Sequence, residues 1–124
     1  METESAETPT VHFLDINIVK GYHAHVYFDQ QSFDQAQSLC IEAGKLFAVE
    51  VGRFHKKPVG PHPCWSCQLK FDKEKHTEII TWLALNRNQL NVLIHPLTGK
   101  DLLDHTDYAA WLGKPQLLNL EVLK

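Results

Sequence analysis

The sequence predicts a single α+β domain in which two helices cover one face of an antiparallel sheet. Two stretches repeat apolar residues at helical spacing, and four short stretches either alternate or are rich in β-forming residues. The length of 124 residues and the apolar fraction of 44% suit one domain with one core. We interpret residues 1–20 as an N-terminal tail and lead-in, and residues 21–124 as the domain. Within the lead-in, Val11 to Val19 alternates imperfectly, which leaves an edge strand and an ordered connection both open.

The first strand is predicted from Tyr22 to Phe28, where the sequence YHAHVYF alternates strictly. One face of this strand carries small and apolar residues and is expected to face the core. The other face presents His23, His25 and Tyr27 in a row, because alternate residues of a strand share one face. The strand therefore brings its polar chemistry to a single surface.

The first helix is predicted from Ser32 to Ala43, and Gly44 is expected to end it. The next segment, Lys45 to Phe54, is rich in β-forming residues and is predicted as the second strand, with Gly52 as a possible bulge. The segment from His55 to Pro63 contains three prolines and one glycine. It is expected to be a shaped loop, and such loops often carry functional residues.

The third strand is predicted from Trp65 to Phe71, and a second helix is expected to begin at Asp72 to Glu74. Asn86 to Asn91 closes this helix, and Asn91 to His95 forms a fourth strand. The order strand, helix, strand, strand, helix, strand is that of the ferredoxin-like fold, with strands one and three at the centre of a four-stranded sheet. The apolar stripe of the second helix includes Ile79, Ile80, Trp82, Leu83 and Leu85.

The segment from Pro96 to Lys124 extends beyond this fold. It contains the turn LTGK, a predicted short helix around Asp104 to Leu112, and the apolar end LLNLEVL. An extension of this kind often packs against a partner, and the uncovered sheet face favours a homodimer.

Composition excludes several classes of function. The formal net charge is −3 and no cluster of Lys and Arg is present, which argues against nucleic-acid binding and membrane-surface binding. No apolar run is long enough to span a bilayer and no secretion signal begins the chain, so a cytoplasmic location is expected. The three cysteines Cys40, Cys64 and Cys67 are expected to be reduced, because they are odd in number and few.

The eight histidines are numerous for a chain of this length. Those on the predicted strands can converge on the helix-free face of the sheet, where imidazoles could bind a divalent metal ion. The alternative is that each is a separate histidine satisfied by one hydrogen bond, and spacing alone leaves both open. The residues concerned are His23, His25, His55, His62, His95 and His105.

Two acids could complete such a site. Two histidines and one carboxylate form the facial triad of non-haem Fe(II) oxygenases, and Glu50 and Asp104 are the available carboxylates. Asp104 could instead orient the ring of His105 or cap the short C-terminal helix. Arg53 could bind a substrate carboxylate through two hydrogen bonds, or form a surface ion pair.

The sequence CWSC from Cys64 to Cys67 has the spacing of redox and zinc motifs. A redox motif of this type opens a helix, whereas this pair lies at the start of a predicted strand, where residues three apart face opposite sides. A structural role is therefore favoured. Trp65, Trp82 and Trp111 are expected to be core aromatics.

Three separated motifs resemble the DOPA 4,5-dioxygenase family. They are GYHAHVYFD at 21–29, EVGRFHKKPVGPHP at 50–63, and WLALNRNQLNVLIHPLTGKDLLDHTDYAAWLG at 82–113. The resemblance implies a ferredoxin-like dimer and, as in characterised fungal members, extradiol cleavage of the catechol ring of DOPA by dioxygen and non-haem Fe(II). Lys100 and the CWSC segment depart from the family pattern.

The resemblance implies that the matching histidines of each motif belong to the functional site. We expect His25, His62 and either His95 or Glu50 to bind the metal, which is Fe(II) or another divalent ion such as zinc. His23, His55 or His105 would transfer protons, since an imidazole titrates near neutral pH. Arg53 would bind the substrate. A metal- or ligand-binding protein without catalysis and a structural dimerisation module are the alternatives.

Overall fold

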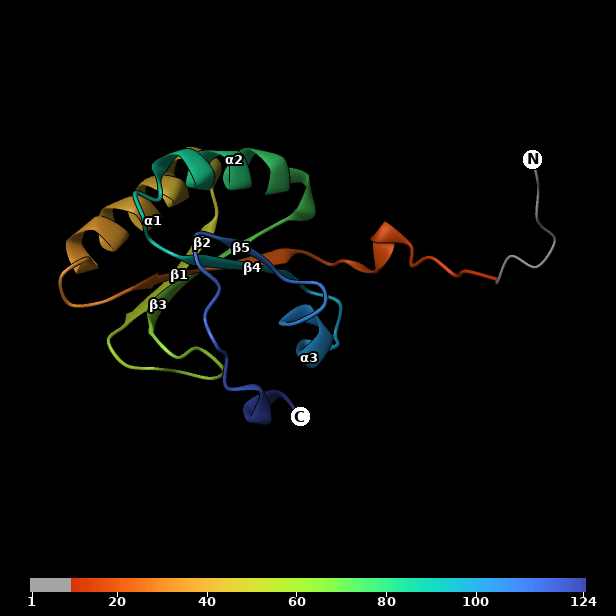
Figure 1. Cartoon of the computed structure of the whole chain (residues 1–124). Coiled ribbons are helices and arrows are strands. Elements are labelled where there is room, and N and C mark those ends of the chain that lie inside the picture. Colours follow the sequence, from red (N-terminus) through yellow and green to blue (C-terminus); the bar gives the residue numbers. More distant parts are fainter. Residues whose placement is uncertain (1–9) are drawn as a thin grey trace, which may run out of the picture.

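The computed structural model describes residues 10–124 as one antiparallel sheet with two helices on one face and a short third helix on the other side (Figure 1). Residues 1–9 of the predicted tail lie outside the described residues. The strands are β1 (Tyr22–Phe28), β2 (Glu50–His55), β3 (Trp65–Phe71), β4 (Val92–Pro96) and β5 (Ala110–Leu112). The helices are α1 (Phe33–Phe47), α2 (His76–Asn86) and α3 (Asp101–Asp104), with 3-10 turns at Ile16–Ile18, Lys73–Lys75 and Leu120–Leu123.

The sheet has the order β2-β3-β1-β4-β5, and each neighbouring pair is antiparallel. The first four strands are those predicted, with β1 and β3 at the centre. The prediction of four strands is wrong because the C-terminal extension adds β5 to the outer edge of β4. Ala110 pairs with Ile94 and Leu112 pairs with Val92. Pairing of this edge satisfies backbone groups of β4 that would otherwise be open to solvent or to other chains.

The predicted short helix from Asp104 to Leu112 is wrong for the same reason. Four residues, Asp101–Asp104, form helix α3, and the chain then extends into β5. Backbone pairing with β4 outweighs local helical preference in this segment.

Gly44 does not end α1, which continues to Phe47. The left-handed residue that ends the helix is Ala48, with φ 55°, and its N–H donates to the carbonyl of Gly44. A Cβ at position 44 would lie 2.8 Å from Cγ2 of Val51 on β2. The glycine is therefore explained by close approach of helix and strand. The predicted second strand starts too early, because Lys45 to Phe47 belong to α1.

We expect Gly44→Ala to destabilise the fold by about 1–2 kcal/mol, because overpacking against Val51 exceeds the gain in helix propensity. The double variant Gly44→Ala, Val51→Ala removes that contact. In the Val51→Ala background the glycine substitution should become neutral or stabilising. Urea unfolding of the four proteins measures the coupling, and equal effects of Gly44→Ala in both backgrounds would contradict the packing explanation.

Two other predictions for the helical layer need adjustment. Helix α2 begins at His76, because residues 73–75 form a 3-10 turn after Asp72. Ile79 and Leu83 are buried as predicted, but Leu85 is 79% exposed and lies outside the packed stripe.

The predicted bulge near Gly52 is confirmed by a register shift between Val51 and Phe54.

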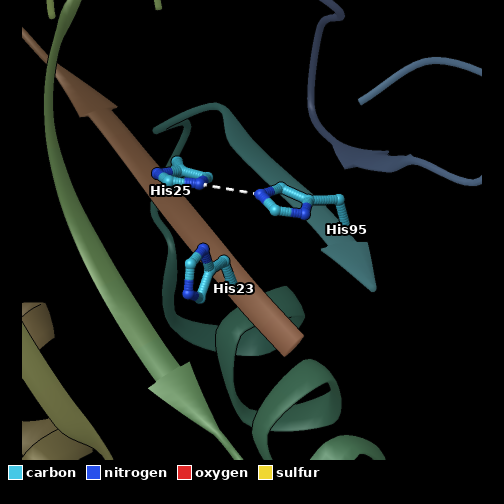
Figure 2. A group of neighbouring side chains, drawn as sticks. All are labelled: His23, His25 and His95. Carbon is cyan, nitrogen blue, oxygen red and sulfur yellow. Dashed lines mark hydrogen bonds between the residues drawn. The ribbon is translucent and has the colours of Figure 1, made fainter. Parts of the chain in front are cut away.

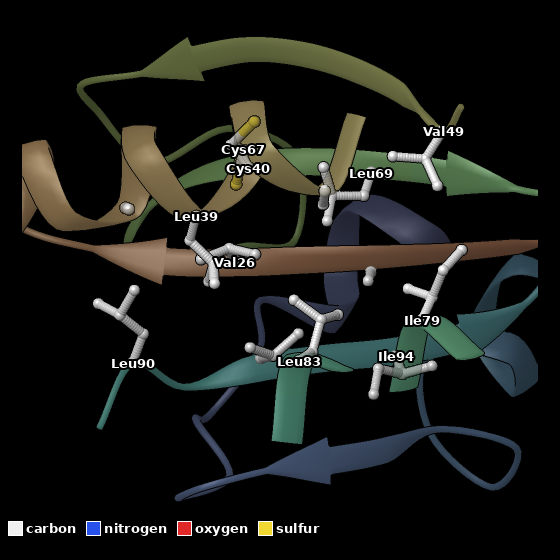
Figure 3. Close-up of a cluster of buried hydrophobic side chains, with 14 of the residues drawn as sticks. Val26, Leu39, Cys40, Val49, Cys67, Leu69, Ile79, Leu83, Leu90 and Ile94 are labelled. Carbon is white, nitrogen blue, oxygen red and sulfur yellow. The ribbon is translucent and has the colours of Figure 1, made fainter. Parts of the chain in front are cut away.

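The core lies between the sheet and the pair of helices α1 and α2 (Figure 3). Cys67 of β3 points into this core beside Cys40 of α1, and Cys64 is half-buried at the start of the strand. All three cysteines are free, as predicted, and of the CWSC pair only Cys67 is buried. Trp65 and Trp82 pack against the core, whereas Trp111 contacts Tyr27 on the opposite face of the sheet.

Residues 10–20 form a lead-in to β1, which settles the alternative that the sequence left open. This segment contains the turn Ile16–Ile18 and extends away from the body of the protein (Figure 1). Its last residue is anchored, because the N–H of Lys20 donates to the carbonyl of Leu97 at 2.8 Å. Among the described residues, no helix is long and apolar enough to cross a membrane.

Candidate metal centre

Strands β1 and β4 place three histidines on the sheet face opposite α1 and α2 (Figure 2). His23 is paired with His95 across the two strands, and His25 lies two residues further along β1 on the same face. Their rings lie within 5.1–5.6 Å of one another, measured between centroids. The strict alternation of β1 therefore delivers its histidines to one place, as predicted.

The closest nitrogen atoms of this group are Nε2 of His25 and Nε2 of His95, which lie 3.0 Å apart. Both side chains are buried, with 5% and 2% of their surfaces exposed. Two nitrogens bound at about 2.1 Å to one ion, at a right angle, are about 3.0 Å apart. The pair therefore has the spacing of two adjacent ligands of one metal ion.

The loop between β2 and β3 adds His62. Gly60 adopts a left-handed conformation, with φ 54°, and the N–H of His62 then closes a turn on the carbonyl of Val59 at 3.0 Å. The carbonyl of Pro61 accepts a hydrogen bond from the N–H of Asn119, so the C-terminal segment holds the loop. The ring of His62 consequently stacks near that of His25, with centroids 4.0 Å apart.

His105 directly follows helix α3, and its ring lies 4.0 Å from that of His95 between centroids. Its Nδ1 lies 2.7 Å from the carbonyl of Asp101. Asp104 neither orients this ring nor caps the helix. Its buried carboxylate accepts hydrogen bonds from the N–H and the hydroxyl of Thr98, at 3.0 and 2.5 Å. These bonds tie α3 to the turn that precedes it.

Five histidines thus form one cluster, which we call the histidine cluster: His23, His25, His62, His95 and His105. Two groups of three within it have ligand atoms within 4.8 Å of one another. One group is His23, His25 and His95, and the other is His25, His62 and His105. His25 belongs to both groups and is therefore the central residue of the cluster.

Two of the rings are oriented by backbone carbonyls. Nδ1 of His95 lies 2.9 Å from the carbonyl of Pro96, and Nδ1 of His105 contacts the carbonyl of Asp101. A carbonyl oxygen only accepts, so in each neutral ring Nδ1 carries the proton and Nε2 keeps its lone pair. This is the arrangement by which proteins fix the tautomer of a metal-binding histidine. The donor set therefore fits a divalent metal ion.

Burial and neighbouring charges keep the rings of His23, His25, His62 and His95 neutral at neutral pH. Burial, assisted by the nearby His105, lowers the pKa of both His62 and His95 from 6.5 to about 4. Burial and the nearby Lys70 lower the pKa of His23 to about 4. Burial, followed by the neighbouring imidazoles, also holds the pKa of His25 well below its usual value. Neutral imidazole is the form that binds metals.

Tyr27 and Trp111 are parts of the site to which sequence reasoning assigned no functional role. The hydroxyl of Tyr27 lies 2.7 Å from Nδ1 of His62, and its ring packs edge-on against Trp111 at 5.7 Å. Tyr27 is 3% exposed, and burial raises the pKa of its hydroxyl. Its position on the same strand face as His23 and His25 was the available signal.

We expect Tyr27→Phe to weaken metal affinity by about 10–100-fold, the usual effect of removing a group that orients a ligand. The hydroxyl that fixes the ring of His62 is lost, while the packing against Trp111 is kept. Tyr22→Phe is the matched control, because Tyr22 lies on the other face of the same strand. Metal titration of both variants tests this, and equal affinities would show that Tyr27 does not support the site.

The structure does not bring every predicted residue into the cluster. Glu50 is exposed on β2, beside Lys70 and Lys75, two strands away from β1. Arg53 is also exposed on β2, and none of the contacts that build the cluster involves it. His55 pairs with Ser66 and lies at the edge of the site. The cluster is therefore composed of imidazoles, without the predicted carboxylate of Glu50.

A pocket of about 170 Å³ opens beside the cluster. It is lined by His25 and His62 of the cluster and by the loop residues Val59 and Gly60. His55, Ser66 and Gln68 supply further polar groups. Pockets for drug-sized ligands are commonly 300–1,000 Å³, so this one suits a small molecule.

Most of the chain is similar in sequence to known proteins. The model of the Dopa 4,5-dioxygenase family matches residues 22–122. The chain is 33% identical over 111 residues to the DOPA 4,5-dioxygenase of Amanita muscaria, covering 82% of this chain and 49% of that protein. It is 32% identical over 123 residues to an uncharacterized 21.2 kDa protein of Botryotinia fuckeliana, covering 90% of this chain and 67% of that one.

A solved structure is similar as well. The crystal structure of a protein from Nostoc punctiforme, provisionally designated a dioxygenase, superimposes with a TM-score of 0.88 at 41% sequence identity. The match covers 90% of this chain and 96% of that chain. This chain spans about half the length of the Amanita enzyme but nearly the whole Nostoc protein. The match to the family model covers all five histidines of the cluster, and the chain belongs to the Dopa 4,5-dioxygenase family.

Proposed function

We propose that this protein is a dioxygenase that cleaves the ring of a small catechol, such as DOPA, at the extradiol position. In this reaction both oxygen atoms of dioxygen enter the product, so no separate reductant is consumed. The observation that carries the proposal is the pair of buried Nε2 atoms of His25 and His95, 3.0 Å apart, in a member of a dioxygenase family.

We infer that the histidine cluster holds the metal, with His25 and His95 as two ligands. The third ligand would come from His23 or His62, since each completes a group that includes His25. Imidazole nitrogens suit Fe(II) as well as zinc, and we propose Fe(II). When bound, the ion would polarise the two catechol oxygens and leave open positions for small ligands.

The remaining polar residues would bind the substrate and move its protons. His55 lines the pocket beside His25 and His62, where an imidazole nitrogen could accept the proton of a catechol hydroxyl. Ser66 and Gln68 could donate or accept hydrogen bonds at the same wall. The pocket volume of about 170 Å³ supports a substrate with a single ring.

The arrangement of the strands and helices also supports an assignment of the fold class. The element order up to β4 and the strand order β2-β3-β1-β4 are those of the ferredoxin-like class. We propose that class for the core, with β5 as an addition at one edge.

The experiment is anaerobic loading with Fe(II), followed by oxygen uptake and visible absorbance with L-DOPA and a panel of catechols. Ring-fission products absorb visible light, so colour and stoichiometric oxygen consumption are expected together. His25→Ala, loaded in the same way, is the inactive control. Tight iron binding without oxygen uptake on any catechol would overturn the enzymatic proposal and favour a metal-binding protein.

A further inference from the structure

A second pocket, of about 430 Å³, lies where α2 and β5 end and β4 begins. Two of its lining residues are cationic and none is acidic, and each lining side chain carries hydrogen-bond donors. The pocket shares no residue with the histidine cluster. It is therefore a separate, basic and donor-rich site, and its lining residues are Arg87, Gln89, Asn91, Gly113 and Lys114.

The guanidinium of Arg87 is held in place at this pocket. Its Nη1 donates to the carbonyl of Leu90 at 3.0 Å. Gly113 has a φ of 84°, and a Cβ at this position would lie 2.7 Å from Nη1 and 3.4 Å from Cζ of Arg87. The guanidinium therefore lies against backbone that carries no side chain. The bond to Leu90 uses one of its five N–H groups, so others remain for a ligand.

The side-chain amide of Asn91 is also oriented. Its Oδ1 accepts a hydrogen bond from the N–H of Lys114 at 2.8 Å. This bond identifies the oxygen end of the amide, so Nδ2 is the end that can donate to a ligand. The amide and the guanidinium of Arg87 both adjoin the α-carbon of Gly113, which makes them neighbours. Their donors therefore serve the same space.

A purely structural role for Arg87 would be to offset the partial negative charge of the carbonyls that end α2. Those carbonyls already have other partners. Nε2 of Gln35 on α1 donates to the carbonyl of Asn88 at 2.7 Å, and the N–H of Leu90 donates to that of Arg87 at 3.0 Å. Within residues 10–124, no carboxylate forms a salt bridge with Arg87 or Lys114. The two positive charges are therefore not neutralised by acidic side chains of these residues.

These groups suit an oxyanion. The planar fork of an arginine binds a carboxylate or a phosphate through two parallel hydrogen bonds, and a lysine adds a point charge. The volume of about 430 Å³ lies within the range of roughly 300–1,000 Å³ that is common for small-molecule sites. The absence of an acid among the lining residues disfavours a cationic ligand.

We propose that Arg87, Asn91 and Lys114 form a binding site for the carboxylate or phosphate group of a small molecule. The site goes beyond the proposed function and does not depend on it. A failed dioxygenase assay would leave this proposal untouched, because none of these residues contacts the histidine cluster in either ligand group.

Titration of the full chain with inorganic phosphate and, separately, with acetate tests the proposal by ¹H–¹⁵N NMR. Sodium chloride keeps the ionic strength constant, so screening of surface charge does not change during the titration. We expect saturable shifts at the backbone N–H of Lys114, the side-chain amide of Asn91 and Nε of Arg87. The anion that binds more tightly identifies the preferred group. No saturable shift at these positions with either anion, or shifts confined to the histidine cluster, would overturn the proposal.

Lys114→Glu reverses the charge at an exposed position of the pocket and should raise the dissociation constant at least about 10-fold, as expected for loss of a charge-assisted contact. Lys45→Glu is the matched control. Lys45 is exposed in the last turn of α1, does not line the pocket, and gives the same change in net charge. Equal weakening by the two substitutions would show that only net charge matters, which contradicts a site.

Arg87→Lys separates binding from stability. It keeps the positive charge and a donor for the carbonyl of Leu90 but removes the fork. The affinity for the better anion should fall about 10-fold, while the melting temperature without anion stays close to that of the unmodified protein. Unchanged affinity in Arg87→Lys would exclude the guanidinium as the group that binds the anion.

Discussion

His25→Ala should abolish stable metal binding, with an affinity loss of at least about 100-fold and no catechol-dependent oxygen uptake. His25 is the one residue that both candidate ligand groups share, and its Nε2 faces that of His95. Removing it leaves either group with two imidazoles, fewer than the three protein ligands of typical catalytic metal sites. Anaerobic titration with Fe(II), and with Co(II) as a spectroscopic substitute, measures the effect.

His12→Ala is the matched control, because His12 is exposed in the lead-in of residues 10–20 and belongs to neither ligand group. It should leave metal affinity unchanged. His23→Ala and His62→Ala separate the two ligand groups, since each removes a residue of one group only. The variant that loses more affinity identifies the third ligand. Unchanged binding in His25→Ala would exclude the cluster as the metal site.

The metal-free protein should lose stability as the pH falls from 6.5 to about 4. His23, His62 and His95 have folded-state pKa values of about 4, below the 6.5 of the unfolded chain. The unfolded state therefore binds more protons in this window, and the stabilisation present above pH 6.5 is lost on acidification. For His95, which is 2% exposed, the loss is on the order of 3 kcal/mol, and the half-buried His23 contributes less because solvent screens it.

Urea unfolding at pH 7 and at pH 4.5 measures this loss. His95→Gln should show a smaller difference between the two pH values, because one titrating ring is removed. Bound metal should shift the loss to lower pH, since it adds stability in proportion to the logarithm of its free concentration over its dissociation constant. A free energy of unfolding that stays constant across the window would contradict the burial of neutral rings.

The local alternation of polar and apolar residues was enough to predict part of the histidine cluster. The strict alternation of residues 22–28 placed His23 and His25 on one face, because a strand has a period of two wherever it lies in the sheet. The order of elements also predicted β1 and β3 as the central strands. These two inferences needed only chain geometry. The pairing of His95 with His23 depends on the register between β4 and β1, which the structure supplies.

Other features depended on contacts between distant segments. Gly44 looked like the end of a helix, but its absent side chain serves packing against Val51. The segment around Ala110 looked helical, but the unpaired edge of β4 makes it a strand. The local sequence does not show which distant segment will lie beside it. The end of α1 and the existence of β5 could therefore not be predicted from it.

The sequence by itself determined the α+β class, the family and a set of candidate histidines, because periodicity and motif spacing are local properties. Only the tertiary structure decided which residues complete the site. It turned Asp104 toward Thr98, left Glu50 on an exposed edge strand and brought Tyr27 to His62. The physical reason is that a binding site is defined by distances between segments far apart in the chain, and packing of the whole sheet sets those distances.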